Sequence, residues 1–274
     1  MYPKILNIYG KISINSYGVM IALGFLLFIY LAYKNPKRAR IISNDTFFNA
    51  IFIGFISAVV GGRIFFVLEE WSSFEDKLEI FYPWIGGFGL LGSIIGVLIT
   101  LPIYLYFKKV KILPFFDLIA IYAPLLQSIS RIGCFLAGCC YGSVCSKDML
   151  YSVVFTNPES LAPLNMPLHP AQLYSSLASF LIFILIYLRS KFRYKPGQIL
   201  FLYLILESIS RFSVDFWRGS RDFFKKDSFL GVFIDIFIYK SNLLSYSQLI
   251  VILILAFAFI GFLWASFFNK TEDK

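Results

Sequence analysis

Three arginines lie inside long apolar stretches of the chain: Arg63, Arg131 and Arg211, each a few residues before its stretch ends. An arginine within a bilayer costs at least a few kcal/mol, so such residues normally face a protein interior or a wet cavity. A planar guanidinium matches phosphate with paired hydrogen bonds. Three arginines at one depth on three helices predict a cationic pocket that binds an anionic headgroup. For Arg131 alone, a side chain that only extends to the membrane surface is an equally open interpretation.

The stretch 197–217 places further charge around one of these arginines. Glu207, Arg211, Asp215 and Arg218 lie at offsets of 0, 4, 8 and 11, which share one face of a helix. A charged face of this length is not expected to meet lipid, so it should face the interior of a helix bundle. The pattern favours a substrate cavity, and a structural ladder of salt bridges is the alternative.

The composition is that of a polytopic membrane protein. Of the 274 residues, 58% are hydrophobic and only 15% are charged, whereas soluble proteins carry about 25% charged residues. The mean hydropathy is +0.74. The net charge of +9 does not indicate nucleic acid binding, because the basic residues cluster between apolar stretches. We see no cleavable signal peptide before the first stretch.

Seven stretches are apolar enough to cross a bilayer as helices, which takes about 20 residues. They are roughly 16–33, 47–68, 84–107, 112–133, 172–188, 197–217 and 246–267. The connections after the first, third and fifth stretches together carry eleven Lys and Arg residues, and the connection after the second is acidic. The positive-inside rule therefore predicts an external N-terminus and a cytoplasmic C-terminus, although the connection at 218–245 is also basic.

The fold prediction is an all-α integral membrane protein with about seven transmembrane helices. We expect one membrane domain over 1–274, with external segments at about 134–171 and 218–245. This orientation puts Tyr17, Gly86, Gly87, His169 and Gln172 at the outer ends of their stretches, at the level of the three arginines. Most residues with distinctive chemistry are thus predicted to lie at the outer face.

Glycines and cysteines surround the end of the fourth stretch. Gly133, Gly138 and Gly142 would let the backbone approach a headgroup closely. The cysteines follow the spacing C-x4-C-C-x4-C, with members at Cys134, Cys139, Cys140 and Cys145. This spacing matches no familiar zinc pattern, and His169 lies well beyond it. A disulfide that uses Cys145, small buried thiols, and a thiol nucleophile with His169 as its base all stay open.

Several segments together resemble the prolipoprotein diacylglyceryl transferase family. These are residues 130–142 (SRIGCFLAGCCYG), 169–174 (HPAQLY), 210–218 (SRFSVDFWR) and 17–25 (YGVMIALGF), with the glycines before Arg63 and at 86–87 in matching places. The resemblance covers most of the chain. It implies a bacterial plasma (inner) membrane enzyme that moves a diacylglyceryl group from phosphatidylglycerol to the lipobox cysteine of prolipoproteins. No metal or organic cofactor is implied, nor any nucleic acid partner.

The resemblance also implies residue roles. The catalytic residues would be Arg131, Arg211, Tyr17, His169 and Asp215, and the substrate-binding residues would be Arg63, Gly142, Gln172, Glu207, Arg218, Gly86 and Gly87.

The chain departs from the family pattern at six positions, one of which is Ser93 in place of the last Gly of the family's His-Gly-Gly stretch. Cys134 and Cys139 replace Asn and Glu, Leu91 stands where the family has His, Glu207 replaces Tyr, and Asp215 replaces Glu. A non-catalytic lipid- or signal-peptide-binding paralogue is therefore a second reading. A transporter is a third reading, which the one-sided placement of charge and the lack of repeats disfavour.

Overall fold

The computed structural model describes residues 2–9, 12–71, 87–219 and 245–267. Long helices dominate it. They are α1 (Ser16–Lys34), α3 (Asn44–Glu69), α4 (Leu90–Phe107), α5 (Ile112–Ala137), α6 (Ala171–Ser190), α7 (Gln198–Asp215) and α9 (Tyr246–Phe267), with the short α2 (Arg38–Ile41) between α1 and α3. Two antiparallel strand pairs accompany them: β1 (Lys4–Tyr9) with β2 (Ile12–Asn15), and β3 (Val153–Val154) with β4 (Pro167–Leu168). The all-helical prediction omitted these strands.

Six helices in the described part of the chain are long and apolar enough to cross a membrane. They are α1, α3, α4, α5, α6 and residues Ser247–Phe267 of α9. The helical, multi-pass membrane class is thus confirmed. Helix α7 is not among the six, because Glu207, Arg211 and Asp215 place three charges in its 18 residues. The count of seven spans therefore stays a prediction.

Two predicted boundaries differ from the structure. The third stretch forms a helix only from Leu90, with residues 87–89 non-helical and residues 84–86 outside the described part. The fourth stretch stays helical to Ala137, so Cys134 belongs to α5 and not to the external segment. Leu136 and Ala137 extend the apolar run, and Gly138 then adopts a positive φ of 78°, a common way to end a helix.

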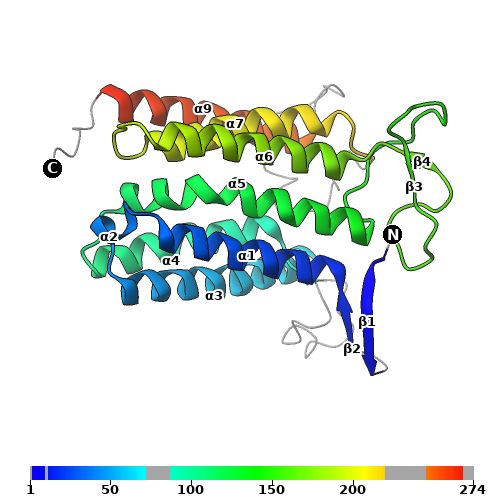
Figure 1. Ribbon diagram of the computed structural model, residues 1–274, viewed down its shortest axis with the longest axis horizontal. Coiled ribbons are helices and arrows are strands. Elements are labelled where there is room, and N and C mark those ends of the chain that lie inside the picture. The colour runs from blue at the N-terminus through cyan, green and yellow to red at the C-terminus, as the bar shows by residue number, and fades with distance from the viewer. Residues whose placement is uncertain (1, 10–11, 72–86, 220–244, 268–274) are drawn as a thin grey trace. The chain divides into compact units, whose positions relative to one another are not determined.

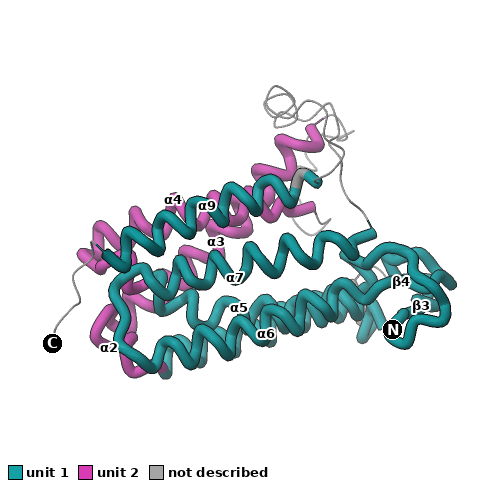
Figure 2. The backbone as a smooth tube through the Cα atoms, turned by 90° about the horizontal axis from the view of Figure 1, so that it is seen from above, with its two compact units in different colours: residues 1–34, 116–223, 240–274 teal, residues 35–115, 224–239 magenta. Residues whose placement is uncertain are grey.

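The chain divides into two compact units (Figure 2). Unit 1 comprises residues 1–34, 116–223 and 240–274, and unit 2 comprises residues 35–115 and 224–239. Whether they form the single domain that we expected stays a prediction.

In unit 1, α5 packs against three other helices (Figure 1). Gly24 of α1 lies against Leu126 of α5. On the α6 side, the hydroxyls of Ser128 and Ser176 are 3.1 Å apart. Helix α7 packs against both α6 and α9.

A buried carboxylate on α5 fixes the start of α7. Asp117 is fully buried, and its two oxygens accept hydrogen bonds from the backbone N–H groups of Gly197, at 2.6 Å, and Leu200, at 2.7 Å. The first N–H groups of a helix have no partner within the helix, so Asp117 supplies what α7 lacks. This contact positions the helix that carries the charged face.

In unit 2, α3 and α4 pack closely. At Gly61 and Gly92, an added Cβ would lie within 2.4 Å of the other helix's carbonyl oxygen, so neither position has room for a side chain. Thr100 also donates a hydrogen bond to the Ser57 hydroxyl at 2.7 Å.

The segment between α5 and α6 forms a small structure around β3 and β4. Phe155, Ala162 and Leu168 form its buried core, and Phe135 from α5 packs against them. This core gives the segment a defined shape at the end of α5.

Candidate functional site

Helix α7 carries its charged face toward other parts of unit 1. The guanidinium of Arg211 lies within electrostatic range of Arg218, Arg131, Asp215 and Cys140. Both Arg131 and Arg211 also act on the carboxyl group of Glu207. Of the three arginines that were predicted to form a cationic pocket, the structure brings Arg131 and Arg211 together. Arg218 is a further cation near Arg211.

Glu207 holds a polar chain that connects α7 to α5. One carboxylate oxygen accepts a hydrogen bond from Gln127 Nε2 on α5, and the Tyr203 hydroxyl donates to Gln127 Oε1 at 3.3 Å. The other oxygen of Glu207 is buried and has no hydrogen-bond partner among the described residues. A buried oxygen without a partner is unusual, and here it lies where Arg131 and Arg211 both act.

Asp215, at the end of α7, bonds mainly to the start of α9. It accepts hydrogen bonds from the hydroxyls of Ser245 and of Ser247, the latter at 2.8 Å. Its ion-pair partner is Arg218, at 3.8 Å. Its charge also acts on Arg211, and a catalytic role of Asp215 stays a prediction.

Gly142 lies where the chain after α5 meets the segment before α6 and the segment after α7. Its N–H donates to the carbonyl of His169 at 3.0 Å, and its neighbour Ser143 donates to the carbonyl of Trp217 at 2.8 Å. A bridge of strand type pairs Gly142 with Arg218. An added Cβ would lie 2.3 Å from the His169 oxygen and 2.7 Å from the Trp217 oxygen, so only glycine fits. This junction fixes Arg218 beside the segment that follows α5.

Tyr17 lies at the start of α1, beside Arg131. A Cβ on Gly133 would lie 3.3 Å from the Tyr17 backbone, so α1 and α5 are in close contact here. Tyr17 also lies within electrostatic range of Cys134 and Arg131. Tyr17 is 41% exposed.

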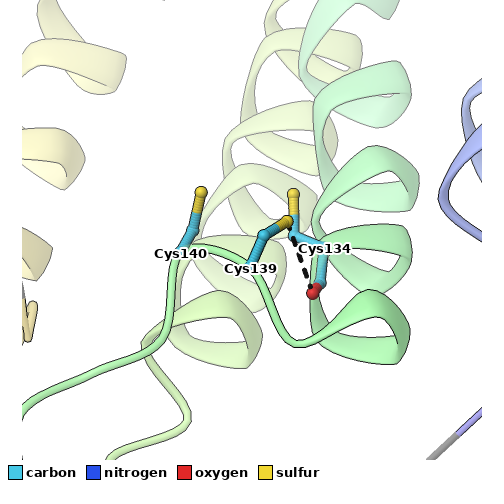
Figure 3. Close-up of side chains that lie close together, drawn as sticks. All are labelled: Cys134, Cys139 and Cys140. Atoms are coloured by element: carbon cyan, nitrogen blue, oxygen red, sulfur yellow. Dashed lines mark hydrogen bonds between the residues drawn. The ribbon is translucent and has the colours of Figure 1, made fainter. Parts of the chain in front are cut away.

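Three thiols gather beside these residues (Figure 3). The sulfur atoms of Cys134, Cys139 and Cys140 all lie within 4.8 Å of one another. Hydrogen bonds from the other two thiols lower the pKa of Cys140, and the positive charges of Arg131 and Arg218 act in the same direction. The pKa of Cys139 is raised by its hydrogen bonds to the other two thiols and by burial.

The remaining cysteine and the histidine do not join this group. All four cysteines, Cys145 included, are free thiols in the structure. His169 Nδ1 lies 3.3 Å from the Tyr174 hydroxyl, and its backbone holds Gly142. Its role as a base stays a prediction.

Gln172 contacts the thiol-bearing segment through its amide. It is 1% exposed, and its Nε2 donates to the carbonyl of Cys139 at 2.9 Å. Its Oε1 is buried without a hydrogen-bond partner among the described residues.

The other predicted residues belong to unit 2 or lie outside the described part. Arg63 donates to the carbonyl of Gly87 at 3.2 Å and stacks over the ring of Phe66, 5.7 Å from its centroid. Gly87 has a φ of 81°, and Gly86 lies outside the described residues. A joint role of Arg63 with the arginines of unit 1 stays a prediction.

Four residues with these contacts were not predicted from the sequence: Gln127, Tyr203, Ser245 and Asp117. A polar side chain in the middle of an apolar stretch is a signal that could have identified Gln127 and Asp117. Ser245 carried no such signal, because its role depends on a contact with α7 thirty residues away.

The sequence of the chain is similar to those of proteins of one family. The family model described as prolipoprotein diacylglyceryl transferase matches residues 3–264. A phosphatidylglycerol–prolipoprotein diacylglyceryl transferase of Clostridium tetani is 37% identical over 221 residues, which cover 80% of this chain and 86% of the relative. A protein of Clostridium perfringens with the same name, numbered 2, is 33% identical, with coverages of 83% and 89%. One from Dehalococcoides mccartyi is 30% identical, with coverages of 78% and 81%. The chain therefore belongs to the prolipoprotein diacylglyceryl transferase family.

Proposed function

We propose that this protein transfers a diacylglyceryl group from phosphatidylglycerol to the lipobox cysteine of prolipoproteins and forms a thioether. The observation that carries the proposal is the grouping of Arg131, Arg211 and Arg218 around Glu207 and Cys140, in a helical membrane protein of this family. The relatives' names state the same two substrates for those proteins.

The arginine grouping suits the charge that the reaction develops. The client sulfur attacks the glyceryl carbon, a carbon–sulfur bond forms, and the carbon–oxygen bond to phosphate breaks. The electron pair leaves with glycerol phosphate, so negative charge grows on the phosphate oxygens. Guanidinium groups that are already held in place stabilise this negative charge without having to move during the reaction. We assign phosphate binding to Arg131 and Arg211.

The other residues of the site would position these groups. Asp215 holds the end of α7, where Arg218 follows, and Gly142 fixes Arg218 from the other side. Tyr17 and Gln172 line the same region through their contacts with α5 and with Cys139. We also propose a substrate-binding role for Arg63, Gly86 and Gly87.

The same contacts support α7 as a seventh span. Glu207 bonds to Gln127 of α5, and Asp215 bonds to serines at the start of α9, so two of its three charges face other helices. Charges turned away from lipid are compatible with a membrane position. We propose seven spans in the bacterial plasma (inner) membrane, with the N-terminus outside and the C-terminus in the cytoplasm.

Complementation of a bacterium depleted of its own transferase tests this function. The unaltered chain should restore growth and prolipoprotein modification. Arg131→Gln and Arg211→Gln should each lower transfer by orders of magnitude while the protein still inserts, because each removes a phosphate contact. Lys at either position should rescue partly, since ammonium lacks the planar fork.

Arg40→Gln, an exposed arginine on α2, is the matched control and should behave as the unaltered chain. Phosphatidylglycerol binding without any transfer by the unaltered chain would favour the non-catalytic paralogue. Near-normal transfer by Arg131→Gln or Arg211→Gln would remove that residue from the site.

A further inference from the structure

The three sulfur atoms meet because the chain reverses directly after α5. Cys134 lies in the last turn of α5, and Gly138 leaves the helix with a φ of 78°. The Cys139 N–H then bonds back to the carbonyl of Cys134 at 3.1 Å, and the Cys139 thiol contacts the same oxygen at 3.7 Å (Figure 3). Cys140 follows with a φ of 56°, a conformation that non-glycine residues seldom adopt. The backbone thus brings the three thiols onto one side of a tight turn.

Packing alone gives no reason for this arrangement. Cys134 is 6% exposed and could serve as a small core residue, but Cys139 and Cys140 are only partly buried. Among the described residues, these three form the one group of three His, Cys, Asp or Glu side chains whose ligand atoms lie together. The cluster also adjoins the proposed transferase site, because Arg131 and Arg218 both act on Cys140.

We propose that Cys134, Cys139 and Cys140 bind one thiophilic divalent metal ion of the zinc class, with a fourth coordination position left open. Zinc–sulfur bonds are about 2.3 Å long, which places the sulfur atoms of a tetrahedral site about 3.8 Å apart. Sulfur atoms already within 4.8 Å of one another therefore need to close by no more than about 1 Å. Rotation of the partly buried thiols of Cys139 and Cys140 about χ1 covers such a distance.

The charges around the cluster suit a metal–thiolate centre. Three thiolates and one divalent ion carry a net charge of −1. The guanidinium groups of Arg131 and Arg218, which already act on Cys140, compensate that charge. Hard cations such as Mg²⁺ prefer oxygen ligands, so three sulfur atoms select for the softer zinc class.

An open fourth position has a use in the proposed reaction, and this step rests on the proposed function. A thiol that binds such a metal loses its proton to solvent and becomes a bound thiolate. The client's lipobox cysteine would bind there, beside the arginines that hold the lipid phosphate. Its sulfur attacks the glyceryl carbon as glycerol phosphate departs, and the resulting thioether, a neutral and weaker ligand, leaves the metal. This would supply thiol activation at the site.

Metal binding is tested with the full-length protein, purified in detergent, reduced and stripped of metal. Titration with Cd²⁺ should produce a thiolate-to-cadmium absorption band that saturates at one ion per chain. Cys→Ser at position 134, 139 or 140 should each weaken binding by at least about tenfold. Cys145→Ser is the matched control and should bind Cd²⁺ as the unaltered chain does.

A second readout needs no variant and therefore does not depend on how the variants fold. With Zn²⁺ bound, a maleimide should label Cys145 and leave Cys134, Cys139 and Cys140 protected, as read by mass spectrometry. Labelling of all four thiols in the presence of Zn²⁺, or the lack of a cadmium band, overturns the metal site.

The role of the fourth position is tested with Co²⁺ in place of Zn²⁺. A lipobox peptide should strengthen the sulfur-to-cobalt absorption, and the same peptide with Ser for Cys should leave it unchanged. Full transfer by the metal-stripped protein overturns this role. If metal binds as expected but no preparation transfers diacylglyceryl, the proposed function fails and the metal site stands.

Discussion

Gly142→Ala is the sharpest single test of how the junction beside α7 supports transfer. The added Cβ would lie 2.3 Å from the His169 carbonyl oxygen, 2.6 Å from the His169 Cβ and 2.7 Å from the Trp217 carbonyl oxygen. Two of these atoms belong to the backbone, which cannot rotate away. Because real Cβ contacts essentially never fall under 3.0 Å, the His169 segment must move by at least about 0.7 Å.

The expected cost follows from that shift. Forcing extra volume into a filled site costs about 1–3 kcal/mol. The bond from the Gly142 N–H to His169 weakens as well, and so does the pairing with Arg218. A displacement near 1 Å at a reacting group can lower a rate by about 100-fold. We therefore expect transfer to fall by one to two orders of magnitude, about 10- to 100-fold, while the helices stay folded.

The assay measures transfer from labelled phosphatidylglycerol to a lipobox peptide, with thermal unfolding followed in parallel. Gly18→Ala is the matched control, because a Cβ on Gly18 meets nothing within 4 Å. Alanine also favours a helix over glycine by about 0.5–1 kcal/mol, so Gly18→Ala should keep full activity. Equal transfer by the Gly142→Ala and Gly18→Ala proteins would refute our account of the junction.

Three further substitutions test single residues. Asp215→Asn should weaken transfer without changing the shape of the pH profile of transfer, because Asp215 bonds to Ser247 and acts as a positioning group. Loss of the acidic or basic limb of that profile would make Asp215 an acid–base group. Asp117→Ala should lower the free energy of unfolding by about 1–3 kcal/mol, because it leaves the first N–H groups of α7 without a partner. Thermal or denaturant unfolding measures this change, and an unchanged stability would contradict it. His169→Gln should lower transfer only modestly and keep its pH dependence, because its ring contacts Tyr174; loss to background in a folded protein would make His169 the general base.

The helices followed from hydropathy because lipid imposes a length on any apolar segment that crosses it. Helix α1 starts at Ser16 and α9 ends at Phe267, as the apolar stretches predicted. The strands β3 and β4 could not be predicted in this way, since each has only two residues and shows no alternation. Their pairing depends on a small core around Phe155, which only the folded chain brings together.

The charged face of α7 shows what the spacing of residues within one helix can and cannot predict. The offsets of Glu207, Arg211 and Asp215 predict that they share a side, because a helix repeats every 3.6 residues. These offsets do not predict which other helices pack against the charged face of α7. The contact of Glu207 with Gln127 and that of Asp215 with Ser247 join residues 80 and 32 positions apart, so they follow from packing alone.

The meeting of three sulfur atoms could not be predicted from the cysteine spacing alone. A continuing helix would turn Cys139 away from Cys134 by about 140°, because five residues at 100° each make one full turn and 140° more. In familiar zinc sites the spacing between ligands fits a short knuckle or hairpin of the chain, and the spacing C-x4-C-C does not predict either. Gly138 breaks the helix between the two residues, and its φ of 78° sends the chain back so that Cys139 bonds to Cys134. A residue without a side chain thus decides whether three sulfur atoms meet.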